Sequence, residues 1–164
     1  MKTKILSDKS PVLFFLMIIF GAFLFSGCSK DTGNNNPPDH VVYTIMGDAS
    51  GAQVSPPVAT AGTGKLVGTY DATDNKFEYS IEWTSLTDAA TAIEIHGPAD
   101  PGVNGDLIFS VTITGGGVSG AKSVTATFTE QQEMDLIAGK LYFTVINAAH
   151  LSGEVRGQIY RLIR

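Results

Sequence analysis

The sequence predicts an all-β fold, an antiparallel sandwich or barrel of about eight strands with one short helix. From Val41 onward, short runs rich in β-branched and aromatic residues are separated by Gly, Pro, Asn and Asp. Only one segment has the spacing of a helix, and Cys28 is the only cysteine, so no disulfide can form within the chain. The fold must therefore depend on a hydrophobic core, which the roughly 137 residues after Gly27 are long enough to form.

The strand signal is clearest over residues 77–83, where apolar and polar residues alternate. Side chains of a strand alternate between its two faces, so this pattern directs one set to the core. That set is Phe77, Tyr79, Ile81 and Trp83. A polar loop over residues 71–76 predicts a hairpin to the preceding strand. The other predicted strands cover residues 41–46, 65–70, 91–96, 106–113, 123–128, 141–146 and 154–162.

One helix is predicted over residues 130–138, with Met134, Ile137 and Ala138 on one face and Gly139 as its stop. It is expected to cross from one edge of the β-structure to the other. No internal repeat of fixed length interrupts the pattern, so residues 41–164 are predicted to form one domain.

The first 27 residues have the parts of a secretory signal peptide. A positively charged start with Lys2, Lys4 and Lys9 precedes an unbroken apolar run over residues 12–25. As a helix this run would be about 21 Å long, whereas a bilayer core of about 30 Å needs nearer 20 residues. The segment is too short for a permanent span and is predicted to be removed after export.

Residues Leu24-Phe25-Ser26-Gly27-Cys28 resemble the lipobox of bacterial lipoproteins, in which the cysteine becomes the lipid-carrying first residue. Phe25 departs from the aliphatic residue that is usual at its position. The lone thiol supports this interpretation, because an exported cysteine without a disulfide partner needs another role. We expect Cys28 to carry acyl chains, palmitate among them, and residues 28–40 to form a flexible linker. The alternative is an ordinary signal peptide beside an incidental cysteine.

Charge limits the partners of the mature chain. Removing residues 1–27 takes away three lysines and Asp8, which changes the net charge from −5 to −7. An acidic domain lacks the clustered Lys and Arg that nucleic-acid binding requires. Anionic lipid headgroups would also repel it, so membrane attachment would depend on the lipid at Cys28. The sequence therefore predicts a lipid-anchored protein of the bacterial cell envelope, on the periplasmic or surface face of the outer membrane.

Three stretches together resemble the CHRD domain, which is named from chordin and is found widely in bacterial exported proteins. They are residues 50–58 with Gly62 and Gly64, residues 92–99 around His96-Gly97-Pro98, and residues 139–147 with 153–159, which include Gly153-Glu154-Val155-Arg156-Gly157-Gln158. Their order and spacing fit that family from Val41 to Tyr160. The resemblance implies a β-sandwich without established enzymatic activity. Because such sandwiches usually have Greek-key connections, the predicted fold is an antiparallel Greek-key β-sandwich.

Four polar residues are candidates for a functional site. They are Glu94 and His96 on one predicted strand, and Glu154 and Arg156 on another. Residues two apart share a face of a strand, so the four side chains would meet if the two strands were neighbours. The guanidinium of Arg156 offers five donors in a planar fork, which suits a carboxylate and nearby carbonyl groups. Such a half-buried network would fix the strand register, and the alternative is a cluster that binds a ligand.

A metal site is another reading of the same residues. The resemblance implies a His-x-His pair with a further histidine on a second strand, a geometry like that of copper/zinc superoxide dismutase. In this chain Glu94 stands at the first position of the pair and Asn147 at that of the later histidine. The candidate metal ligands that remain are His96, Glu94 and His150. Asn is a poor ligand for zinc or copper and no cysteine is available, so the sequence predicts neither a metal nor another cofactor.

The leading functional hypothesis is a membrane-anchored, non-catalytic binding or structural module of the cell envelope. The sequence has no Gly-x-Ser-x-Gly elbow, and lipid would prevent Cys28 from acting as a nucleophile. An envelope protein or a polysaccharide is the expected partner, and the growth-factor role noted for animal CHRD proteins is not expected to transfer. The alternative is a metal-binding envelope enzyme with superoxide-dismutase-like geometry.

Overall fold

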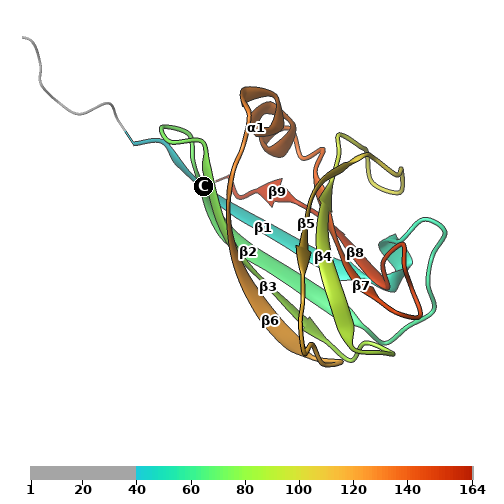
Figure 1. The fold of residues 1–164 in the computed structure, drawn as a ribbon. Helices are drawn as coiled ribbons and strands as arrows, with labels where there is room; N and C mark the ends of the chain where they lie inside the picture. Colours follow the sequence, from blue (N-terminus) through green and yellow to red (C-terminus); the bar gives the residue numbers. More distant parts are fainter. Residues whose placement is uncertain (1–39, 164) are drawn as a thin grey trace, which may run out of the picture. The chain divides into compact units, whose positions relative to one another are not determined.

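Nine antiparallel β-strands and one α-helix make up the computed structural model, which describes residues 40–163 (Figure 1). The strands are β1 (Val42–Ser50), β2 (Thr63–Asp71), β3 (Lys76–Thr84), β4 (Ala90–His96), β5 (Leu107–Thr112), β6 (Gly120–Thr127), β7 (Tyr142–Asn147), β8 (Val155–Gln158) and β9 (Tyr160–Arg161). A short 3-10 turn, η1 (Gly51–Gln53), follows β1, and the helix α1 (Glu130–Ile137) lies between β6 and β7. Neither helix in this part of the chain is long and apolar enough to cross a bilayer. The predicted signal peptide and Cys28 lie outside the described residues.

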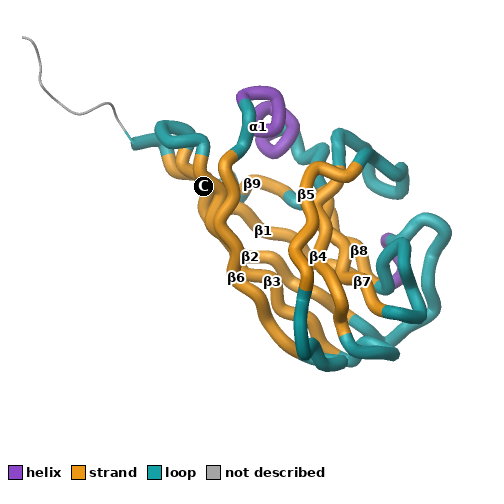
Figure 2. Tube along the Cα trace, viewed as in Figure 1, coloured by secondary structure: helices purple, strands orange, loops and turns teal. Residues whose placement is uncertain are grey.

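All nine strands belong to one continuous sheet, in the order β5-β4-β7-β8-β1-β2-β3-β6, with β9 paired to β1. The all-β class, the antiparallel pairing and the single short α-helix expected from the sequence are confirmed. The two separate sheets of a Greek-key sandwich are not confirmed. The sheet instead curls around the core as a half-barrel, with β4 and β5 facing β2 and β3 (Figure 2).

The two halves of the sheet are joined where β1 meets β8 and β9. Ser50 at the end of β1 pairs with Arg156 of β8, and β9 pairs with the middle of β1. Glycine permits this close approach, since a Cβ atom on Gly157 would lie 2.7 Å from the carbonyl oxygen of Asp48. Because β1 is nine residues long, it pairs with β2 along its whole length and still holds β8 and β9. Because β1 pairs with strands of both halves, the two sheets expected from the sequence form a single sheet.

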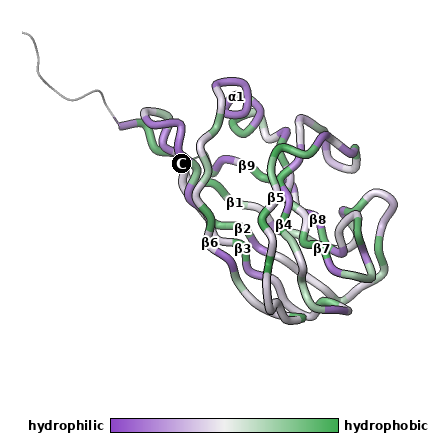
Figure 3. The backbone as a smooth tube through the Cα atoms, viewed as in Figure 1, coloured by the Kyte–Doolittle hydropathy of each residue, from purple (hydrophilic) through white to green (hydrophobic). Residues whose placement is uncertain are grey.

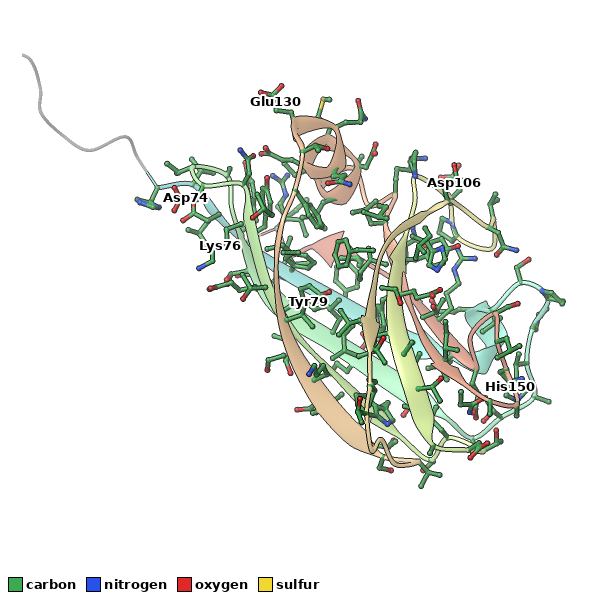
Figure 4. The ribbon with its side chains drawn as sticks, viewed as in Figure 1. Asp74, Lys76, Tyr79, Asp106, Glu130 and His150 are labelled. Atoms are coloured by element: carbon green, nitrogen blue, oxygen red, sulfur yellow. The ribbon has the colours of Figure 1, made fainter. Side chains whose placement is uncertain are left out.

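The hydrophobic core lies inside the curl, and Figure 3 shows hydrophobic segments along the strands of the sheet. The four core-facing residues predicted for β3 are all buried: Phe77, Tyr79, Ile81 and Trp83. Aromatic rings cross the core, since the Phe109 centroid lies 6.4 Å from that of Tyr79 and 5.8 Å from that of Phe128. These contacts join β3 to β5 across the curl, and Figure 4 shows Tyr79 inside it. Aromatic side chains therefore occupy the interior.

Every predicted strand has a counterpart, and the run predicted over residues 154–162 contains both β8 and β9. The predicted helix begins with a capping box between Thr129 and Gln132, and Gly139 follows it with a φ of 69°. It leads from the edge strand β6 to β7 in the other half, as expected. The predicted helix face is wrong, because Leu136 is fully buried whereas Met134 is 56% exposed. A helix of eight residues at the end of the sheet buries only one side chain in the core.

Candidate functional site

A row of polar side chains crosses the outer face of β4, β7 and β8. The antiparallel register places Glu94 opposite Thr144, and Thr144 opposite Arg156. The residues between them in sequence belong to the core, so alternation directs this row away from it. Two residues further along each strand, His96 of β4 lies opposite Tyr142 of β7. The structure thus brings together three of the four candidate residues, Glu94, His96 and Arg156.

Tyr142 is the centre of a stack of three planar groups. The His96 ring lies nearly parallel to the Tyr142 ring, with the centroids 5.1 Å apart and the planes inclined by 7°. The guanidinium carbon of Arg156 lies 3.6 Å from the Tyr142 ring centroid. Because β7 lies between β4 and β8, His96 and Arg156 reach this ring from the two neighbouring strands. Arg156 is only 2% exposed, and a cation over an aromatic face in such a desolvated place contributes about 2 kcal/mol.

The stack also holds the 97–106 loop, which follows β4. Arg156 donates to three oxygen atoms of this loop: the carbonyl oxygens of Val103 at 2.7 Å and Asp100 at 3.4 Å, and Asn104 Oδ1 at 3.4 Å. Burial lowers the pKa of the Arg156 guanidinium, and the neighbouring Tyr142 hydroxyl partly opposes this shift. The bonds to the loop replace hydration that the buried guanidinium has lost. Arg156 is therefore a structural cation that fixes one wall of the site.

The pair formed by Glu94 and His96 is more accessible. His96 Nε2 lies 2.9 Å from Glu94 Oε2, and His96 Nδ1 lies 3.3 Å from the Gly105 carbonyl oxygen. The two side chains remain 23% and 18% exposed, respectively. The Glu94 carboxylate consequently presents an oriented acceptor at the surface, next to the stack.

Glu154, the fourth candidate residue, belongs to a separate network. Its fully buried carboxylate accepts hydrogen bonds from the Thr60 hydroxyl, the Asn147 side-chain amide, the Thr87 hydroxyl at 2.8 Å, and the Thr87 backbone N–H at 2.9 and 3.0 Å. Burial alone would raise the pKa of this carboxyl, but the hydrogen bonds outweigh burial and lower the pKa below its usual value. Two residues along a strand are about 7 Å, so Glu154 lies beyond the row that Arg156 shares with Glu94. It joins two loops to the end of β7.

A cleft of about 730 Å³ lies over the polar row. Its floor is formed by β4, β7 and β8, and its walls are formed by residues 54–58, 104–105 and 149–153, in loops that Figure 2 shows beside these strands. Two walls are linked, since Asn104 Nδ2 donates to the Ser55 carbonyl oxygen over 3.2 Å. In the floor, the buried Thr144 hydroxyl has no hydrogen-bond partner within the described residues. A buried hydroxyl without a protein partner calls for a specific explanation.

A sequence profile of the CHRD domain matches residues 47–159, which include every strand of the cleft floor. The chain belongs to the CHRD domain family. Neither a curated protein nor a solved structure matched the chain. The three stretches that resemble this family in sequence all reach the cleft of the CHRD domain, through Ser55, His96 and Arg156 among others.

The third candidate metal ligand of the CHRD domain, His150, lies in the wall of the cleft (Figure 4). Its backbone N–H donates to Asn147 Oδ1 over 2.9 Å, which ties the 148–153 loop to the end of β7. Among residues 40–163, no three His, Cys, Asp or Glu side chains are grouped closely enough to hold a metal ion. Glu94 and His96 pair with one another, and His150 does not complete a ligand set with them.

The sequence prediction missed three residues of this CHRD cleft: Asn104, Tyr142 and Thr144. Tyr142 and Thr144 lie two apart in the strand predicted over residues 141–146, so their shared face could be read from the sequence. Their role could not, because it depends on β7 lying between β4 and β8. Asn104 lies in a loop, and no local pattern marks its contact with Ser55.

Proposed function

We propose that this protein is a lipoprotein of a bacterial cell envelope, anchored by lipid on Cys28, whose CHRD domain is a non-catalytic binding module. The observation that carries the proposal is the cleft on the outer face of β4, β7 and β8. Its polar groups are held in fixed orientations by the stack on Tyr142, and a preorganised surface of this kind is what ligand binding requires.

The side chains in the cleft favour binding over catalysis. Catalysis by a hydroxyl nucleophile needs a base within hydrogen-bond distance of that hydroxyl. The Thr144 hydroxyl has no such partner in the described part of the chain, and His96 is oriented instead toward Glu94 and Gly105. The guanidinium of Arg156 is engaged with the 97–106 loop. Each group is therefore placed to hold the cleft or to contact a ligand.

The anchor is tested by changing Cys28→Ser in the full chain. We expect the wild-type protein to sediment with membranes and to incorporate labelled palmitate, and the variant to lose both properties. Palmitate labelling of the variant, or membrane attachment that survives the change, would contradict the proposal.

The binding role is tested by retention of envelope components on the immobilised protein. Leu151 is exposed at the edge of the cleft, whereas Val118 is exposed elsewhere, so Leu151→Lys and Val118→Lys form a matched pair. A component retained by the wild type and by the Val118 variant, but not by the Leu151 variant, is the expected result. Retention by all three proteins, or by none, would argue against a ligand in the cleft.

A further inference from the structure

We infer that the cleft binds a neutral saccharide unit of a polysaccharide, through Glu94, Thr144 and the apolar cleft edge. This inference rests on the binding role proposed above and names its ligand class. It is carried by the balance of charge in the cleft, by the order of acceptors and donors along its floor, and by the pairing of the floor strands.

The charges that line the cleft favour an uncharged ligand. Glu94 and Arg156 carry opposite charges in the same row, and the guanidinium of Arg156 faces loop oxygen atoms and the Tyr142 ring. An anionic ligand would also approach a mature chain with a net charge of −7, which opposes its association. A cationic ligand would lie in the same row as the buried guanidinium of Arg156, whose like charge repels it. A neutral polar molecule meets neither obstacle.

The floor offers hydrogen-bonding groups in an order that hydroxyl groups can match. Glu94 provides an acceptor, and Thr144 on the neighbouring strand provides a group that both donates and accepts. Neighbouring strands lie about 4.8 Å apart, so neighbouring hydroxyl groups of one ligand can reach both side chains. The bond to His96 uses Glu94 Oε2 and leaves Oε1 to accept from a ligand. Sugar hydroxyl groups both donate and accept, so one saccharide can bond along this row.

The walls supply the apolar surface that such a ligand also needs. Val54, Pro56 and Val58 line one side of the cleft, and Leu151, which is strongly exposed, lies on another. A sugar ring has C–H groups as well as hydroxyls, so it can contact apolar walls while it bonds to the floor. Burial of this surface adds favourable free energy in proportion to the area covered.

An extended peptide fits the cleft less well. Peptides commonly bind as an added strand at a sheet edge, where backbone N–H and C=O groups are unpaired. Each strand of the floor is already paired on both sides: β4 with β5 and β7, β7 with β4 and β8, and β8 with β7 and β1. The floor therefore offers side chains and no open backbone edge.

The inference is tested with the full chain, purified in detergent, on a panel of neutral gluco-, galacto- and manno-oligosaccharides. Uronic-acid oligomers and short peptides serve as comparison probes, and calorimetry measures the affinity for any probe that binds. Glu94→Gln should lower the affinity for a neutral oligosaccharide about tenfold, because a charge-assisted bond is lost. Thr144→Val keeps the shape of the side chain and should lower the affinity about fivefold, because one neutral hydrogen bond is lost. Glu82→Gln, an exposed carboxylate on β3, is the matched control and should leave affinity unchanged.

Binding of a neutral oligosaccharide that both cleft variants weaken supports the inference. No neutral sugar bound, binding only of uronic acids, or equal affinity in the wild type and either cleft variant would overturn it. A peptide bound in a Glu94-dependent way would also overturn it, while leaving the proposed binding module in place. The anchor is judged separately by the Cys28→Ser fractionation, whose result does not depend on any sugar.

Discussion

Replacing Glu154 with glutamine is expected to lower the free energy of unfolding by about 3 kcal/mol at neutral pH. The carboxylate is buried and accepts hydrogen bonds from three segments of the chain, through Thr60, Thr87 and Asn147. A glutamine amide keeps one acceptor oxygen and places an NH₂ group where the second carboxylate oxygen accepted bonds. Two bonds to a charged group, each contributing about 1.5–3 kcal/mol, would be lost. Relaxation of the side chains around residue 154 would recover part of this loss.

The same contacts give the stabilisation a definite pH dependence. The hydrogen bonds hold the pKa of Glu154 below its usual value of 4.5. A carboxyl with a depressed folded-state pKa stabilises the fold above its unfolded pKa, and this contribution is lost as the pH falls through the folded pKa. The wild-type protein should therefore lose stability on acidification below about pH 4.5. The gap between it and the glutamine variant should narrow over the same range.

Urea unfolding can be followed by the fluorescence of Trp83, the only tryptophan, which is buried in the core. Curves measured from about pH 7 to about pH 3 give the free energy of unfolding of each protein. Glu82→Gln, on the exposed side of β3, is the control and should stay within about 0.5 kcal/mol of wild type. A Glu154→Gln protein as stable as wild type at neutral pH, or a gap that does not narrow in acid, would refute the reasoning.

Three further outcomes follow from the structure. Gly157→Ala should lower the free energy of unfolding by at least about 2 kcal/mol, because its Cβ would lie 2.7 Å from the Asp48 carbonyl oxygen. An unchanged melting temperature in thermal unfolding would contradict the close approach of β1 and β8. Arg156→Lys should speed amide exchange in the 97–106 loop at least about tenfold, because lysine cannot both stack and bridge three oxygens. The purified full chain should hold copper and zinc only below stoichiometry, whereas stoichiometric metal that His96→Ala removes would favour the metal-enzyme alternative.

The fold could be predicted from the sequence wherever local spacing decides it. The alternation over residues 77–83 correctly assigned four core side chains, and Gly139 correctly marked the end of the helix. The single curled sheet depends on a contact between β1 and β8, which lie far apart in the chain. Gly157 makes that contact sterically allowed, but a glycine in a strand has several common explanations. The pairing of strands far apart in the chain therefore could not be predicted from the sequence.

The candidate site shows the same division. Two-residue spacing placed Glu94 and His96 on one face, and their pairing follows directly from it. It also placed Glu154 beside Arg156, but the antiparallel register sets Arg156 in the row of Glu94 and leaves Glu154 one step away. This difference of two residues along the strand changes the environment of Glu154 completely. Its carboxylate is not exposed at the cleft but is buried, where it joins loops.

Residues that hold the cleft must be distinguished from residues that face its ligand. Changing Arg156 or Tyr142 would loosen the 97–106 loop and weaken binding for a structural reason alone. Thr144 differs, because its buried hydroxyl makes no hydrogen bond within the described residues and leaving such a group unpaired costs about 1–3 kcal/mol. Thr144→Val should therefore keep or increase the melting temperature while it lowers the affinity for the saccharide. Tyr79→Phe removes the other buried hydroxyl that is unpaired among residues 40–163; this hydroxyl lies in the core, and its loss should leave binding unchanged. A stabilised Thr144 variant with undiminished affinity would show that the hydroxyl serves no ligand.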